Sequence, residues 1–169
     1  MRAIRLGFVI FVLVTLQTTL VADLNVRGTC ADIVMLLPIA VGIVHGRDEG
    51  AIAGFAAGFV LDLVVHGTPV GFFALGYTLT GYIVGMAQAT VLRAAWWIPV
   101  LTAIGGSVIG VATLGLLAKI VGLEDFLDTH LIVVAAAVAV VNAVLVLPMV
   151  RVVRWALPAP TGSGRLVIS

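Results

Sequence analysis

The chain has 169 residues, of which 62% are hydrophobic and 10% are charged, and its formal net charge is +1. A soluble domain carries roughly 25% charged residues, so this chain has too few to cover a surface in water. No cluster of lysine and arginine exceeds a pair, which argues against nucleic-acid binding. A single cysteine, Cys30, excludes an internal disulfide. With a mean hydropathy of +1.27, the composition predicts one all-α integral membrane domain whose main solvent is lipid.

Six apolar segments follow one another along the chain. About 20 largely apolar residues are needed to cross the hydrocarbon core of a bilayer. Five segments come close to or reach this length: Leu6–Ala22, Gly50–Val65, Val70–Leu92, Trp97–Ala118 and Leu131–Val150. The second in chain order, Ile33–Val44, is short and contains Pro38, so taken alone it could be re-entrant or interfacial. The first segment ends in Thr-Leu-Val-Ala-Asp, a poor cleavage sequence, so we interpret it as an uncleaved span.

The distribution of basic residues favours six spans with both termini in the cytoplasm. In that arrangement the basic residues of the cytoplasmic segments are Arg2, Arg5, Arg47, Arg93, Arg151, Arg154 and Arg165. Only Arg27 and Lys119 lie outside, together with the acidic loop of residues 122–130. Cytoplasmic loops carry the excess of lysine and arginine, so the short segment is predicted to cross. Residues 1–157 then form the transmembrane domain, and residues 158–169, rich in Pro, Gly and Ser, form a flexible cytoplasmic tail.

A ladder of glycines leads to a carboxylate in the third segment. Gly46, Gly50, Gly54 and Gly58 recur every four residues, and Asp62 continues the spacing. Residues four apart share a helix face, and small residues there let another helix approach closely. The groove could receive a helix of this chain or of a partner, with internal packing the more common outcome. Leucine at Gly54 or Gly58 is expected to disrupt the protein far more than alanine.

Asp62 needs a physical reason because a charge inside a membrane helix is costly, roughly 2.5–3.5 kcal/mol at the helix centre. The structural interpretation caps it with nearby loop amides or pairs it with His66, Gln17 or Asn142. The functional interpretation makes it a proton, ion or partner site. His45 lies at a segment boundary and is expected to be solvated, whereas Gln17 and Asn142 should face the bundle. Asp32 opens the second segment, where a carboxylate suits a helix N-terminus.

Catalysis has no visible machinery in this sequence. No serine accompanies a His/Asp set, no paired carboxylates lie inside the membrane, and no loop could cradle a phosphate. No Cys/His grouping has metal-ligand spacing. The sequence therefore predicts a non-enzymatic protein without a cofactor.

The arrangement resembles the rod shape-determining protein MreD family. The resemblance rests on Gln17-Thr18, on Asp32, and on the run that places Gly50, Gly54, Gly58, Asp62, Gly67 and Gly71, followed by Ala74-Leu75 and Gly81-Tyr82. It covers roughly residues 6–85, and the rest matches by topology only. The family usually reads Pro-Asp-Leu where this chain has Ala31-Asp32-Ile33, so the entry to the second helix is the main departure.

The resemblance implies a non-enzymatic subunit of the cell-elongation complex in the bacterial inner membrane, supporting lateral peptidoglycan synthesis and cell shape. It implies binding to the bitopic protein MreC and links to MreB, RodA and its transpeptidase partner. In this setting the candidates for helix packing or partner contact are Gln17, Asp32, Gly50, Gly54, Gly58, Asp62 and Gly71.

An alternative is the substrate-binding S component of an energy-coupling-factor vitamin transporter, which has a similar six-helix bundle. Those components usually carry an Ala-x3-Ala type pattern in the first span for docking the coupling subunit. The first span here, beginning Leu-Gly-Phe-Val-Ile-Phe-Val-Leu-Val-Thr, has no small-residue pair at that spacing. A lipid-modifying enzyme, a third interpretation, would need residues that this chain lacks.

Overall fold

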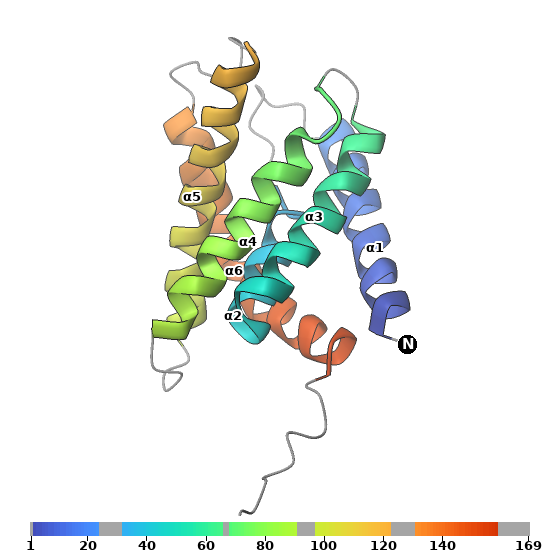
Figure 1. Ribbon diagram of the computed structural model, residues 1–169, viewed down its shortest axis with the longest axis vertical. Coiled ribbons are helices and arrows are strands. Elements are labelled where there is room, and N and C mark those ends of the chain that lie inside the picture. Colours follow the sequence, from blue (N-terminus) through green and yellow to red (C-terminus); the bar gives the residue numbers. More distant parts are fainter. Residues whose placement is uncertain (1, 24–31, 66–67, 91–96, 123–130, 159–169) are drawn as a thin grey trace, which may run out of the picture.

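The computed structural model describes residues 2–23, 32–65, 68–90, 97–122 and 131–158. Within these ranges the chain forms six α-helices and no β-strand (Figure 1). They are α1 (Arg2–Asp23), α2 (Leu36–His45), α3 (Arg47–Val64), α4 (Phe72–Thr90), α5 (Ile98–Val121) and α6 (Leu131–Ala156). Each helix coincides with one predicted segment. The largest difference is at the end of α6, which continues six residues past Val150 (156 − 150).

Three of these helices are long and apolar enough to cross a membrane: α1, α5 and α6. Helix α2 and the apolar part of α4 are shorter, and α3 opens with the charged residues Arg47, Asp48 and Glu49. The protein is therefore a membrane protein by the length and composition of its described helices. The predicted tail, residues 158–169, lies outside the described residues from position 159 on, as do the acidic loop, Cys30, His66 and Arg93.

The outside of the bundle is apolar, unlike the surface of a soluble protein, and the core is apolar too. Large apolar side chains such as Phe8, Phe11 and Phe55 are exposed on the outside of the bundle. The buried polar side chains among the described residues are Asp62, Thr80, Ser107 and Asn142. An apolar exterior suits contact with lipid, whereas polar groups within a bilayer need partners inside the protein.

Helix α2 is the centre of the bundle. All its side chains from Leu36 to Ile43 are buried, and it contacts α3, α4, α5 and α6. Pro38 is the third residue of the helix. The first-turn N–H groups have no partner within the helix, so proline is tolerated there. Ten residues span only roughly 15 Å, about half a bilayer core. A turn over residues 32–35 precedes it.

Three chain segments meet at one end of the molecule. The Nη1 of Arg5 donates to the Trp155 carbonyl at 3.2 Å, and the guanidinium lies 5.2 Å from the Trp155 ring centroid. The start of α1 therefore lies beside the end of α6, at the lower end of Figure 1. The Nε2 of His45 lies 2.7 Å from the Leu157 carbonyl oxygen, to which it donates in the Nε2-protonated tautomer. His45 is half-buried at this contact, so the expectation that it is solvated is wrong.

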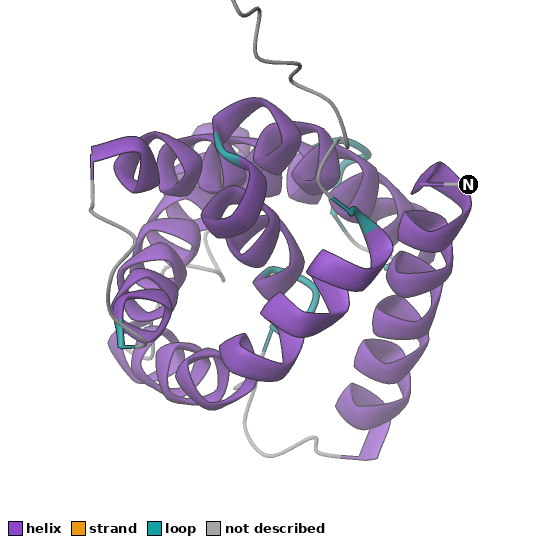
Figure 2. Cartoon of the chain, turned by 90° about the horizontal axis from the view of Figure 1, so that it is seen from below, coloured by secondary structure: helices purple, strands orange, loops and turns teal. Residues whose placement is uncertain are grey.

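Helices α1 and α3 both run away from this end, upward in Figure 1. The chain between them must return across the bundle, and α2 forms the last part of that return. Helix α1 itself lies at the edge of the bundle, as Figure 2 shows for the helix beginning at the marked N-terminus. Its buried side chains among those described are Val9, Ile10, Leu13 and Val14.

Candidate functional site

The glycine ladder of α3 lies against α4, backbone to backbone. A Cβ added at Gly54 would come within 2.2 Å of the Tyr77 carbonyl oxygen, and one at Gly58 within 2.4 Å of the Phe73 carbonyl oxygen. The approach is reciprocal at Gly50 and Gly81, where added Cβ atoms would lie 2.6 Å and 2.2 Å from the other residue's carbonyl oxygen. The groove that the ladder predicts is thus occupied by a helix of the same chain. Even the methyl group of alanine has no room here, so alanine at Gly54 or Gly58 is itself expected to push the two helices apart.

Helix α2 joins the same contact through Gly42, near its C-terminal end. A Cβ on Gly42 would lie 2.9 Å from the Gly81 carbonyl oxygen, and one on Gly85 would lie 2.4 Å from Cα of Arg47. Gly46, between α2 and α3, has φ +93°, a left-handed conformation that glycine adopts without steric cost. Three helices can therefore converge here because glycines of α2, α3 and α4 let their backbones approach closely.

Asp62 caps helix α4. Its Oδ2 accepts hydrogen bonds from the backbone N–H groups of Gly71 and Ala74, and its Oδ1 accepts one from Phe73, all at 3.0 Å. The first N–H groups of a helix have no intrahelical acceptor. Gly71 directly precedes α4 and has no side chain to cap it, so the acceptor comes from α3. Asp62 is 4% exposed, and its charge lies at the positive end of the α4 dipole.

Asp32 performs a related task at the entry to α2. Its Oδ1 accepts from the Met35 N–H at 3.0 Å, which closes the turn that leads into the helix. Its Oδ2 accepts a hydrogen bond from the Tyr77 hydroxyl. From the other side, Gln17 of α1 accepts the Ile33 N–H on its Oε1 at 3.0 Å. The three polar residues therefore fix the entry of α2 between α1 and α4.

Tyr77 is the residue of this helix contact that the sequence did not predict. Its side chain is fully buried, its backbone carbonyl faces Gly54, and its hydroxyl reaches Asp32. A signal for it exists, because Phe73, Tyr77, Gly81 and Gly85 recur every four residues on α4, as the glycines do on α3. A buried tyrosine usually needs a hydrogen-bond partner for its hydroxyl.

The remaining buried polar side chains bond within their own helices or between α5 and α6. Thr80 and Ser107 donate to carbonyls four residues earlier in their own helices. Between helices α6 and α5, the Asn142 Nδ2 donates to the Ser107 Oγ at 2.8 Å. The Asn142 Oδ1 is buried without a hydrogen-bond partner among the described residues. Gln17 and Asn142 thus both reach across helix interfaces.

This arrangement is suited to holding helices in place. Both carboxylates have their oxygens occupied by donors of the protein itself. Among the described residues, no group of three or more His, Cys, Asp or Glu side chains could hold a metal ion. We name the contact formed by Gly50, Gly54, Gly58 and Asp62 with α4 the α3–α4 seam.

No protein-family model, curated protein or solved structure matches this chain. The seven candidate residues, from Gln17 to Gly71, fall into two groups in the structure. The structure gathers Gln17 and Asp32 at the entry to α2, and the three glycines, Asp62 and Gly71 at the α3–α4 seam.

Proposed function

We propose that this chain is a non-enzymatic, six-span membrane subunit of the bacterial cell-elongation complex. In this role it binds an MreC-like bitopic protein and supports lateral peptidoglycan synthesis and cell shape, with links to MreB, RodA and its transpeptidase. The observation that carries the proposal is the use made of the residues on which the MreD resemblance rests. These residues all make contacts that fix one helix against another. They are Gln17, Asp32, the glycine ladder, Asp62 and Gly71.

A scaffold subunit needs such contacts more than an enzyme or a carrier does. A catalytic or transport carboxylate must be able to exchange partners with a substrate or a proton. Asp62 instead accepts three backbone N–H groups that have no other acceptor in α4. A rigid bundle of this kind would present its outer faces to other membrane helices.

The proposed topology places both termini in the cytoplasm of a bacterial cell, with the protein in the inner membrane. Arg2 and Arg5 at the start of α1 lie at the same end as Arg154 at the end of α6, whereas Lys119 lies near the end of α5 at the other end of the bundle (Figure 1). The excess of arginine favours the cytoplasm for the first end. The common direction of α1 and α3 supports a full return crossing between them.

Cysteine labelling tests this topology. Cysteines at Glu124 or Asp128 should react with a membrane-impermeant maleimide from the periplasmic side, and those at Arg47 or Arg93 only after the inner membrane is permeabilised. The native Cys30 is replaced beforehand so that it gives no background. Labelling of position 47 in cells with an intact inner membrane would contradict the six-span arrangement.

Affinity purification from native membranes in mild detergent tests the function. Recovery of the single-pass elongation protein of the same organism is expected, together with rounded cells when the chain is depleted. Recovery of an ATPase-coupled transmembrane subunit would favour the S component of a vitamin transporter instead. Helix α1 argues against that alternative because its exposed surface carries the large side chains Ile4, Phe8 and Phe11.

A further inference from the structure

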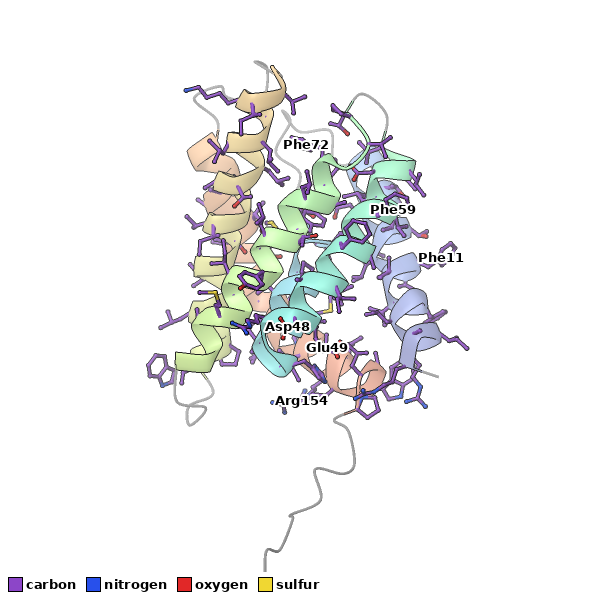
Figure 3. The ribbon with its side chains drawn as sticks, in the orientation of Figure 1. Phe11, Asp48, Glu49, Phe59, Phe72 and Arg154 are labelled. Carbon is purple, nitrogen blue, oxygen red and sulfur yellow. The ribbon has the colours of Figure 1, made fainter. Side chains whose placement is uncertain are left out.

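Helix α3 has two contrasting faces, and only one of them is used inside the chain. Its glycine face lies on α4. The opposite face carries Ile52, Phe55, Phe59 and Leu63, whose exposed fractions range from 41% to 62%. Figure 3 shows Phe59 pointing away from the neighbouring helices. The rings of Phe55 and Phe59 are stacked, with centroids 6.0 Å apart, so they form a continuous ridge on the surface.

An acidic residue lies at the foot of the same stripe. Asp48, Ile52, Phe55 and Phe59 are separated by four, three and four residues, which places them within an arc of about 60° on the helix. Apolar residues spaced three and four apart are the pattern by which one helix packs along another. The Asp48 side chain is 81% exposed, and Glu49 beside it is exposed too (Figure 3).

These carboxylates lie in the first turn of α3, where the helix dipole favours negative charge, but they differ in sign from the charged residues around them. The other charged residues described there are arginines, including Arg5, Arg151 and Arg154. The Asp48 carboxylate forms an ion pair with its neighbour Arg47, with Nε and Oδ1 3.6 Å apart. Both side chains are exposed, so this pair is weak. In the proposed topology this end faces the cytoplasmic leaflet, whose anionic headgroups attract arginine and repel carboxylates. A lipid surface alone therefore suits the apolar stripe but not its acidic foot.

A single-pass helix that enters from the cytoplasm suits both parts. Its apolar span would lie along the phenylalanine ridge, and the positive-inside rule gives its cytoplasmic flank lysine or arginine at the level of Asp48 and Glu49. We propose that the exposed face of α3, formed by Asp48, Glu49, Ile52, Phe55, Phe59 and Leu63, is the docking surface for the transmembrane helix and basic flank of a bitopic partner. This inference rests on the proposed function and assigns it a surface.

Helix α5 provides a matched control surface. Its exposed side chains Leu101, Ile104 and Val108 are aliphatic, and the first turn of α5 carries no acidic residue. A photoreactive amino acid, p-benzoylphenylalanine, is introduced at Phe55, at Phe59 or at Val108 in the full-length chain. Each variant is co-expressed with the tagged MreC-like protein of the same organism, irradiated in membranes and analysed for covalent products.

Cross-links to the bitopic protein are expected from positions 55 and 59 and not from position 108. Asp48→Lys with Glu49→Lys should reduce recovery of the partner at least tenfold, and exchange of the partner's basic flank for glutamate should restore it. Arg151→Glu, a charge reversal at the same end but on α6, should leave recovery unchanged.

The outcomes separate this inference from the proposed function. If the wild-type chain recovers the bitopic protein but the cross-links form only from Val108, or only between two copies of this chain, the surface is wrong and the function stands. If the double lysine variant binds as well as wild type, the acidic foot has no role and the inference falls. If the wild-type chain recovers no bitopic protein, the proposed function falls and this surface falls with it.

Discussion

Two glycine-rich helices of this protein use the same spacing in different ways. On α3, Gly50, Gly54 and Gly58 bring the backbone of α4 into direct contact. On α5, Gly106 and Gly110 are also four residues apart, but a Cβ there would meet side chains. The nearest atoms are Cγ2 of Val84 at 2.8 Å and Sδ of Met35 at 2.3 Å.

The difference lies in what can move. A carbonyl oxygen in a helix is fixed by its own hydrogen bond, whereas the end of a methionine side chain can change rotamer. The α3–α4 seam is therefore a rigid contact, whereas the α5 glycines provide space for the side chains of Val84 in α4 and of Met35 just before α2. The spacing of small residues indicates close packing in both helices. It does not tell whether the glycines contact the backbone or the side chains of their neighbours.

The largest effect is expected from alanine at the seam. Gly54→Ala places a methyl group against the Tyr77 carbonyl, so the helices must separate along their length. We expect a loss of about 3 kcal/mol, the upper part of the usual range for overpacking. Gly110→Ala should lose about 1 kcal/mol because Met35 can adjust. Thermal unfolding in detergent, followed by size-exclusion chromatography, measures both, and equal losses would contradict the distinction.

Asp62 comes second, because it closes the end of the seam near the C-terminus of α3. Asp62→Leu removes the acceptor for three N–H groups at once and should cost about 2 kcal/mol, within the range of about 1.5–3 kcal/mol for a hydrogen bond to a charged group. The three bonds share one carboxylate and are lost as a unit, so their contributions do not add. Asp62→Asn keeps one oxygen but turns an N–H₂ group toward one of the donors, so an intermediate loss is expected. The same melting measurement checks the order. A stable leucine variant would show that the cap does not hold α4.

The Asp32–Tyr77 hydrogen bond tests the entry of α2 separately from the seam. Tyr77→Phe keeps the buried ring and removes the hydroxyl donor, so about 1.5 kcal/mol should be lost. In a double-mutant cycle, Asp32→Asn should cost less in the chain that already carries Tyr77→Phe than in wild type. Strict additivity of the two losses would mean that the hydrogen bond contributes no stability.

The smallest effect is expected between α5 and α6. Ser107→Ala removes the acceptor of the Asn142 amide, and such contacts between membrane helices contribute about 0.6 kcal/mol on average. A shift in melting temperature well below that of Gly54→Ala is expected. A loss as large as that of the seam variant would show that α5 and α6 depend on this polar pair as strongly as α3 and α4 depend on their glycines.

Much of the fold could be predicted because each helix corresponds to one apolar run of limited length. The entry of α2 was indicated by Asp32, because a carboxylate suits a helix N-terminus. The sequence predicted the ends of the helices less accurately. Helix α6 extends past Val150 because its last turns remain packed, with Val153 and Ala156 buried. His45 was expected in solvent, but the Leu157 carbonyl just after α6 lies against its ring.

The sequence by itself determined the all-helical class, the approximate bounds of the helices and the residues able to pack closely. Those properties depend on local composition and on the helical repeat. The tertiary structure decided that α4 fills the glycine groove, that Asp62 caps α4 and that Tyr77 is the partner of Asp32. A membrane helix is apolar on its buried and its lipid-facing sides alike, so its hydrophobic pattern does not tell which face turns inward. Only the positions of the neighbouring helices supply that information.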